Sequence, residues 1–238
     1  MHAPSFCVLR SQDEVLDSAR RGTALGLARP PVFEKWWDNL LALEALQGLE
    51  REPVVDLGCR TGIVLTWLHQ QGFRVLAGCD LRRPVPPLLG TLRRRRLGDA
   101  LAMSAMYLRH RRRMHRVSIE STGLPAGSFA AATCLSVIEH GVDLPRFFAE
   151  AQRILRPGGR LIVSTDYWPE PIDLGNSRLW NDSADVIFDA FGLEQLVELA
   201  RGAGFLVPMA DGSVGDPVVS YRGRHYTFVL MTFLKPGG

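Results

Sequence analysis

Short, continuous apolar runs alternate with amphipathic stretches over most of the chain, and this alternation restricts the possible folds more than any other feature. The runs that are typical of strands are 54–55, 74–79, 117–119, 130–138, 161–164, 205–207 and 226–234. Stretches with helical periodicity separate most of them, namely 62–71, 144–155 and 193–203. A strand that is apolar throughout is buried on both faces, as in a parallel sheet with helices on either side. The pattern predicts a doubly wound α/β fold with a mostly parallel, seven-stranded sheet.

The two ends of the chain deviate from this alternation. The last two apolar runs are joined by a Gly-, Asp- and Pro-rich stretch, 211–217, so we expect a hairpin whose final strand is antiparallel. In residues 1–50 the apolar side chains fall at helical spacing, interrupted at Pro30 and Pro31. We therefore expect an N-terminal helical extension or lid over residues 1–50 and one Rossmann-like domain over residues 51–238.

Composition excludes several classes of protein. The chain contains no run of ~18 apolar residues, so we expect no transmembrane helix and no membrane partner. The N-terminus has neither the basic nor the apolar segment of a secretory signal. The four cysteines have neither the paired spacing of a zinc site nor the density of a disulfide framework: Cys7, Cys59, Cys79 and Cys134. These features predict a cytoplasmic, reduced protein without a metal.

Charge is distributed unevenly, although the net charge is only +3. Residues 82–116 hold eleven arginines and one acid, whereas residues 170–216 hold nine acids and two arginines. The first segment is longer than a usual connection between strands, so we interpret about 82–116 as a basic insertion with one or two amphipathic helices. It could dock a phosphate-bearing substrate, a nucleic acid or an acidic carrier protein, or it could be a solvated face or a dimer contact with the acidic segment of a second copy. Few aromatic side chains interrupt the arginines, which disfavours single-stranded nucleic acid.

An acid and two glycines follow the first apolar run. Asp56 ends the strand, and Gly58 and Gly62 are spaced as G-x-x-x-G. A nicotinamide dinucleotide site would instead read G-x-G-x-x-G, because its second glycine lets the backbone approach the pyrophosphate. An acid ahead of the turn suits a cationic or amine-bearing ligand, although a plain turn between a strand and a helix can have the same sequence.

Four further motifs stand at or near the ends of later strands. Asp80 ends the second apolar run, where a carboxylate can accept hydrogen bonds from both hydroxyls of a ribose. Glu120 follows the third run, the fourth leads to Glu139 and His140, and Leu-Arg-Pro-Gly-Gly at 155–159 precedes the fifth. Ligands of such sheets bind beyond the carboxyl ends of the strands. Each motif alone is a weak signal, whereas the five in this order are a strong one.

In this order, over about residues 50–235, the motifs resemble those of the class I S-adenosylmethionine-dependent methyltransferases, in the branch that mostly modifies small molecules. The resemblance implies that S-adenosylmethionine is the cofactor. It also implies that four sets of residues contact successive parts of the cofactor. The methionine group would contact Asp56, Gly58, Arg60 and Gly62, and the ribose would contact Asp80 and Leu81. The adenine would contact Glu120 and Ser121, including the backbone amide of Ser121, and the sulfonium would lie beside Ser136 and Val137. Arg60 departs from the usual glycine of the family. It would cost backbone freedom at a positive φ, and its side chain could reach the cofactor carboxylate.

The same resemblance places three candidate catalytic side chains near the acceptor. His140 would act as the general base for a hydroxyl acceptor, or would only start a helix. Asp166 and Tyr167, after the fifth strand, would face the acceptor or pack in a lid.

The resulting hypothesis is methyl transfer to a small molecule, at oxygen, nitrogen or carbon. The acceptor would be sugar-like or natural-product-like, with acidic or phosphate groups, and the chain could form a homodimer. One alternative is an RNA or protein methyltransferase that docks through the basic insertion. The other is a non-methylating, cofactor-binding partner protein.

Overall fold

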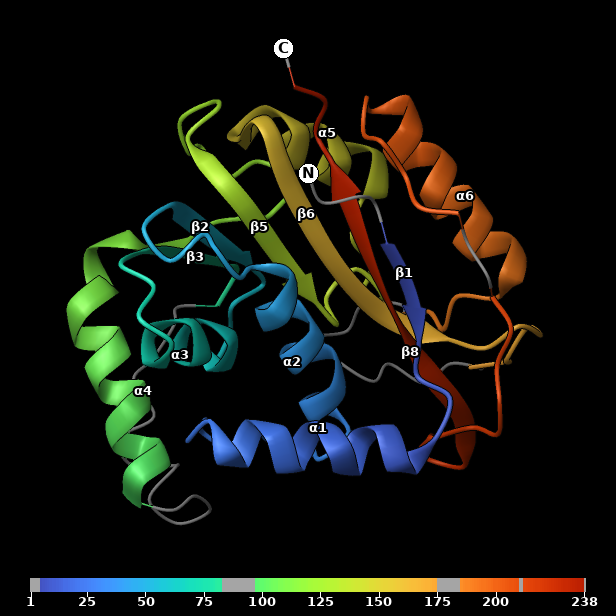
Figure 1. Cartoon of the computed structure of the whole chain (residues 1–238). Coiled ribbons are helices and arrows are strands. Elements are labelled where there is room, and N and C mark those ends of the chain that lie inside the picture. The colour runs from blue at the N-terminus through green and yellow to red at the C-terminus, as the bar shows by residue number, and fades with distance from the viewer. Residues whose placement is uncertain (1–4, 83–96, 175–184, 210–211, 238) are drawn as a thin grey trace.

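A mixed sheet forms the centre of the computed structural model, which describes residues 5–82, 97–174, 185–209 and 212–237 (Figure 1). Within these residues the sheet has eight strands in the order β1-β8-β6-β5-β2-β3-β4, and β7 pairs with β8 outside this path. The strands are β1 Ser5–Val8, β2 Pro53–Leu57, β3 Val75–Asp80, β4 Met114–Arg116, β5 Phe129–Leu135, β6 Leu155–Tyr167, β7 Val219–Tyr221 and β8 Arg224–Leu234. The helices are α1 Gln12–Ala24, α2 Lys35–Ala45, α3 Ile63–Gln70, α4 Leu97–His110, α5 Leu144–Ile154 and α6 Ala190–Gly202, with a short 3-10 helix, η1, at Arg111–Arg113.

Successive residues of the inner strands point to opposite faces of the sheet, which explains why these strands are apolar without interruption. In β2, Val55 and Leu57 belong to the core that includes α5 and α6, whereas Val54 belongs to the core that includes α1, α2 and α3. In β8, Met231 and Leu230 divide between the two cores in the same way. Helices therefore cover both faces (Figure 1), and the predicted doubly wound α/β fold is confirmed.

Strand order reverses at β2. This strand pairs in parallel with β3 on one side and with β5 on the other. The sheet continues in parallel through β4 at one edge and through β6 toward the other. β8 is antiparallel to β6, as expected for the final strand. Because the connections after β2 and β5 leave in opposite directions, a crevice opens at the carboxyl ends of these two strands.

The third strand of the parallel sheet begins earlier than its apolar run suggested. β4 is Met114–Arg116, and the predicted strand at 117–119 lies beyond it. The register pairs Arg116 with Asp80, the last residue of β3. The amide of Val117 then donates to the carbonyl oxygen of Asp80 at 3.1 Å. Because Asp80 is the last residue of β3, the pairing of β3 with β4 ends there.

The edge beside β8 also differs from the prediction. Residues 205–207 form no hairpin strand there, and Leu206 makes only a single bridge with Leu234. β1 occupies the edge instead and pairs antiparallel with β8, from Ser5 opposite Thr232 to Val8 opposite Val229. The first fifty residues are therefore not helical throughout.

Tryptophan side chains join the N-terminal helices to α3. The ring of Trp36, at the start of α2, lies 5.0 Å from that of Trp67 in α3. A Cβ on Gly22 of α1 would lie 2.3 Å from the Trp36 ring, so this contact requires glycine. In the basic insertion, residues 83–96 lie outside the described residues, and the predicted amphipathic helix is α4. Within the described part of the chain, no helix is long and apolar enough to cross a bilayer.

Candidate active site

A pocket of about 460 Å³ opens at the carboxyl ends of β2, β3, β4 and β5, beside the reversal in strand order. Eight residues that the sequence analysis assigned to the cofactor or to catalysis line it: Gly58, Arg60, Asp80, Leu81, Glu120, Ser136, Val137 and His140. Five lining residues had not been assigned: Arg82, Ser118, Ile119, Gly141 and Val142. The structure thus brings the loops after four strands, β2, β3, β4 and β5, together around one cavity.

The turn after β2 approaches the pocket closely because it has glycine where a side chain would collide. Gly58 has φ +82°, and a Cβ there would lie 2.4 Å from Cγ2 of Val137. Gly62, ahead of α3, has φ +70°, and a Cβ there would lie 2.7 Å from the methyl group of Met106. Between them, Arg60 has φ +29°, a conformation that costs a non-glycine residue about 1–3 kcal/mol. The turn therefore stores strain at the position where the sequence has arginine in place of glycine.

Asp56 lies buried beneath this turn. Its Oδ1 accepts a hydrogen bond from the hydroxyl of Thr133 in β5 at 2.7 Å, and burial raises the pKa of its carboxyl to about 7. With Lys35 and Asn39 of α2, Asp56 lines a smaller hollow of about 150 Å³. This hollow adjoins the main pocket at Gly58, which lines both.

Asp80 is held in the pocket wall by two backbone amides. The amide of Arg60 donates to Oδ2 at 2.8 Å, and the amide of Arg82 donates to Oδ1 at 2.7 Å. Each carboxylate oxygen has a second lone pair, so both can still accept a hydroxyl hydrogen bond. The carboxylate is therefore oriented before a ligand arrives, which suits recognition of a ribose diol.

Glu120 links the pocket rim to the segment ahead of α5. Its Oε1 accepts a hydrogen bond from the amide of Asp143 at 2.9 Å. The next residue, Ser121, is not among the described residues that line the pocket. Its amide, which the resemblance directs at adenine, donates to the carbonyl oxygen of Ser118 at 3.3 Å.

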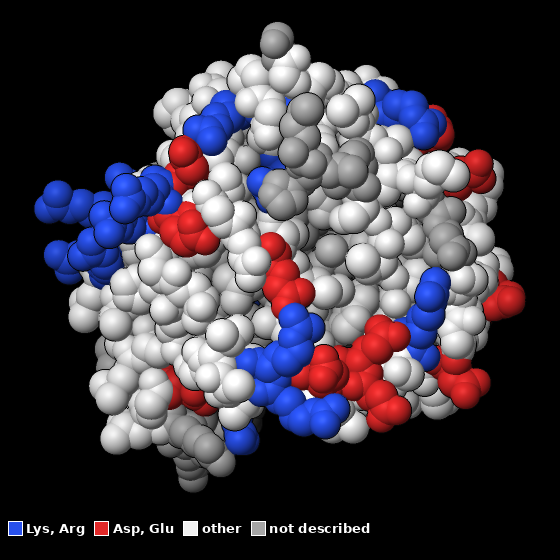
Figure 2. Space-filling model, in the orientation of Figure 1, with Lys and Arg blue, Asp and Glu red and all other residues white. Residues whose placement is uncertain are grey.

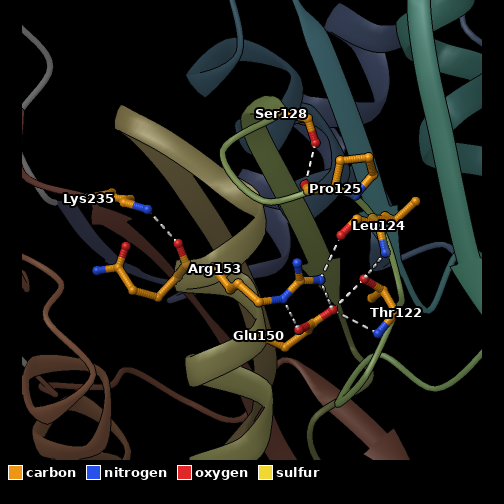
Figure 3. Close-up of polar contacts among 8 residues, drawn as sticks. Thr122, Leu124, Pro125, Ser128, Glu150, Arg153 and Lys235 are labelled. Atoms are coloured by element: carbon orange, nitrogen blue, oxygen red, sulfur yellow. Dashed lines mark hydrogen bonds and ion pairs between the residues drawn. The ribbon is translucent and has the colours of Figure 1, made fainter.

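The loop that carries Glu120 is fixed to α5 by hydrogen bonds to Glu150 and Arg153, which form an ion pair within that helix (Figure 3). Glu150 accepts a hydrogen bond from Nε of Arg153 at 2.7 Å and bonds from the amide, at 2.7 Å, and the hydroxyl of Thr122. Arg153 also donates to the carbonyl oxygen of Leu124 at 2.7 Å. The hydrogen bond from Arg153 is the main cause that lowers the pKa of Glu150 to about 2. The loop consequently has a defined position relative to α5.

His140, on the pocket rim after β5, is paired with a carboxylate that the sequence analysis missed. Its Nδ1 lies 2.8 Å from Oδ1 of Asp185; the side chain of His140 is 28% exposed and that of Asp185 only 4%. The amide of Val186 donates to the carbonyl oxygen of Glu139 at 2.8 Å, so the two segments run beside each other. Asp185 belongs to no strand or helix and lies 45 residues further along the chain, so no local pattern marked it.

The other two predicted catalytic residues, Asp166 and Tyr167, are not among the described residues that line the pocket. Tyr167 is 1% exposed within the core, and its hydroxyl donates to the carbonyl oxygen of Gly212 at 3.1 Å. Asp166 is half-buried near Glu139, and desolvation raises the pKa of both carboxyls above the ordinary values.

Lys35 connects the N-terminal helices to this site. Its Nζ donates to Oδ2 of Asp38 at 2.9 Å and to the hydroxyl of Ser136, and lies 3.6 Å from the centre of the Phe228 ring. Asp38 is fully buried and also accepts a hydrogen bond from the hydroxyl of Ser164 at 2.7 Å. Lys35 was not predicted as a site residue. The sequence feature that could have marked it is the rarity of lysine, because only two of the 28 basic residues in the chain are lysines.

Comparison with known proteins identifies relatives of the chain. A family model described as a methyltransferase domain matches residues 30–207. An uncharacterised transposon protein of Streptomyces fradiae is 30% identical over 175 residues, which cover 70% of this chain and 47% of that protein. The ubiquinone biosynthesis O-methyltransferase of Xanthomonas oryzae pv. oryzae is 28% identical over 147 residues, which cover 55% of this chain and 56% of that enzyme. The chain thus spans about half the length of the curated relatives it matches.

Solved structures share the fold at low sequence identity. The cyclase SpnF is 18% identical, with a TM-score of 0.58 over 95% of this chain and 96% of its own. Geranyl diphosphate C-methyltransferase from Streptomyces coelicolor is 17% identical, with a TM-score of 0.56 over 90% of this chain and 87% of its own. These likenesses support the fold, and the family model covers most of the chain, including the pocket. The chain therefore belongs to the methyltransferase domain family, whose methyl donor is S-adenosylmethionine.

Proposed function

We propose that the protein transfers a methyl group from S-adenosylmethionine to a hydroxyl group of a small acceptor, natural-product-like or sugar-like, with His140 as the general base. The observation that carries this proposal is one pocket lined by Gly58, Asp80 and His140. The name of one relative supports a hydroxyl acceptor, because it is an O-methyltransferase of ubiquinone biosynthesis. The geranyl diphosphate C-methyltransferase that shares the fold supports a small acceptor and not the choice of oxygen.

The pocket has the features that S-adenosylmethionine requires. Gly58 lets the backbone of the turn lie against Val137, where a side chain would collide. Asp80 offers two carboxylate oxygens, oriented by backbone amides, to the hydroxyls of a ribose. Glu120 offers a carboxylate for the exocyclic amine of adenine. When bound, the cofactor would supply an electrophilic methyl group for in-line displacement. The work left to the chain is to align the acceptor and to remove its proton.

Asp185 holds His140 in the form that a general base requires. The Nδ1–H group of His140 donates to the carboxylate of Asp185, which places the basic lone pair of the ring on Nε2. The same carboxylate stabilises the imidazolium that forms when the hydroxyl proton is transferred. Asp185 acts through His140 and is a positioning residue.

The N-terminal extension contributes to the same site in this proposal. Lys35 of α2 donates to Ser136, which lies at the end of β5 with φ +52°. We infer that residues 1–50 form a wall of the site and function together with the Rossmann-like domain.

The cysteines Cys7, Cys59, Cys79 and Cys134 are free thiols, which supports a reducing, cytoplasmic setting.

Transfer of a labelled methyl group tests the proposal directly. The protein is incubated with methyl-labelled S-adenosylmethionine and a panel of phenols, sugars and amines. We expect label in hydroxylated compounds, and loss of transfer in His140→Gln with retained binding of S-adenosylhomocysteine. Label in amines alone would contradict a hydroxyl acceptor, and label in RNA or protein would contradict a small one. Cofactor binding without any transfer would assign the chain to the non-methylating class.

A further inference from the structure

A second concave site lies at the opposite end of β3 from the proposed methyl-transfer pocket. Arg74 precedes β3 and Asp80 ends it, so the six residues of this strand separate the two sites by about 20 Å. Arg74 lines a hollow of about 460 Å³ together with the end of α4 and all of η1: Leu108, Arg109, His110, Arg111, Arg112 and Arg113. We call this hollow the arginine hollow. The two cavities share no described lining residue.

The arginine hollow carries positive charge without a matching negative charge. Five of the seven described residues that line it are arginines, and none of the seven is an acid. Within the described residues, no carboxylate lies within ion-pair distance of these five guanidinium groups, whereas Arg153 and Arg156 elsewhere pair with glutamates. Figure 2 shows basic side chains gathered at the left of the view, where α4 ends in Figure 1. The C-terminal dipole of α4 amounts to about half a charge and accounts for only part of this excess.

An uncharged imidazole lies at the base of the hollow. His110 is 4% exposed, and its Nε2 lies 3.4 Å from Nδ1 of His69 at the end of α3. Burial, together with His69 and Arg109, lowers the pKa of His110 to about 4, so this ring stays uncharged at neutral pH. The positive charge of the hollow therefore comes from the guanidinium groups, which repel one another. A bound anion would relieve this repulsion.

We propose that the arginine hollow binds a small oligophosphate, such as the diphosphate or triphosphate group of a nucleotide, separately from the methyl-transfer pocket. Guanidinium groups bind phosphate oxygens through paired, charge-assisted hydrogen bonds, and several adjacent arginines suit several linked phosphates. The volume of the hollow lies within the usual range for small ligands. Apart from His110, the part of its lining that the structure describes offers no ring on which a base could stack, which disfavours single-stranded nucleic acid.

Calorimetric titration of the full chain with inorganic tripolyphosphate tests the affinity. We expect saturable binding that weakens as salt is added, and orthophosphate should bind at least about tenfold more weakly because it contacts fewer arginines. Arg112→Ala should weaken tripolyphosphate binding about tenfold or more. The matched control, Arg20→Ala, removes an exposed arginine of α1 and should leave the affinity unchanged. S-adenosylhomocysteine should bind Arg112→Ala as it binds the parent chain.

Histidine NMR signals locate the bound anion. Tripolyphosphate should shift the ring signals of His110 and His69 and leave those of His140 in place. Displacement of tripolyphosphate by S-adenosylhomocysteine would overturn the proposal, because it would place the anion in the methyl-transfer pocket. Equal affinity for orthophosphate and tripolyphosphate, or no effect of Arg112→Ala, would also overturn it. So would a single-stranded RNA that binds far more tightly than tripolyphosphate and depends on Arg112, since the hollow would then belong to a nucleic-acid surface.

Discussion

Asp80 supports two backbone amides and faces the pocket, so its replacement removes more than one interaction. We expect Asp80→Ala to weaken binding of S-adenosylhomocysteine by about 10- to 150-fold, or about 1.5–3 kcal/mol, because the acceptors for the ribose hydroxyls are lost. Asp80→Asn keeps one acceptor oxygen and should show an intermediate loss. Calorimetry measures both variants, and an unchanged affinity in Asp80→Ala would remove Asp80 from the cofactor site.

The pair formed by His140 and Asp185 should affect turnover and leave cofactor binding intact. With a hydroxyl acceptor, His140→Gln should lower kcat by about 10²–10⁴-fold, because glutamine keeps much of the volume and lacks the basic nitrogen. Asp185→Asn should lower kcat by a smaller factor, and Asp185→Glu should restore part of the loss. Steady-state kinetics separates these effects, since KM for the cofactor should stay constant in all three variants. Normal turnover of His140→Gln on the true acceptor would exclude His140 as the base.

Backbone strain at Arg60 gives a prediction for stability. At φ +29°, glycine is less strained than arginine, while its greater freedom in the unfolded chain offsets part of the gain. We expect Arg60→Gly to raise the free energy of unfolding by about 1 kcal/mol. Arg60→Ala removes the same side chain without relieving the backbone and serves as the control. Urea denaturation compares them, and equal stabilities would show that Arg60 is unstrained.

At the scale of elements, Glu150 of α5, which pairs with Arg153 of the same helix and accepts hydrogen bonds from Thr122 of the loop at 118–125, should make stability depend on pH. The pKa of Glu150 is lowered from 4.5 in its ordinary state to about 2 in the fold. Its stabilising contribution is therefore complete above about pH 4.5 and is lost as the pH falls toward 2. The full shift corresponds to about 3 kcal/mol, which solvent screening reduces to about 2.

We expect Glu150→Gln to be less stable than the parent chain by about that 2 kcal/mol at pH 7, with the difference disappearing near pH 2. Urea denaturation across this range measures it. Glu198→Gln is the matched control, because Glu198 pairs with Arg201 at an exposed site on α6, where the loss should stay below about 1 kcal/mol. A difference for Glu150→Gln that persists unchanged at low pH would contradict the assigned ionisation.

The elements also show what the sequence could and could not predict. The inner strands were recognisable because burial on both faces leaves a continuous apolar run, as in β5 and β8. β1 has only four residues, and a single one is fully buried, so its pattern is short; its partner lies at the far end of the chain. Asp166 and Tyr167 are adjacent in β6, and strand geometry directs adjacent side chains to opposite faces, so both could not face one pocket. The contact between His140 and Asp185 is tertiary and has no local signature.

At the scale of the whole molecule, acids with raised pKa values make the free energy of unfolding depend on pH in the opposite direction to Glu150. Burial raises the pKa values of Asp56, Glu139 and Asp166 to about 7. Between about pH 4.5 and 7 the folded chain retains protons that the unfolded chain has released, so the free energy of unfolding should fall as the pH rises through this window. Glu139→Gln should reduce this fall, because the amide keeps the shape of the side chain and does not ionise. Urea denaturation at pH 5 and pH 8 tests this, and a stability that increases over the interval would contradict it.

The pairing of β1 with β8 has a consequence for the order in which the chain is assembled during translation. Ser5 is synthesised before nearly all of the chain that separates it from its partner, Thr232. β1 must therefore remain without its partner strand while every other described element emerges. β6 likewise has an open edge until β8 is inserted between it and β1. A nascent chain that stalls before residue 224 would expose both strand edges, which are templates for aggregation, and would depend on chaperones until β8 is released.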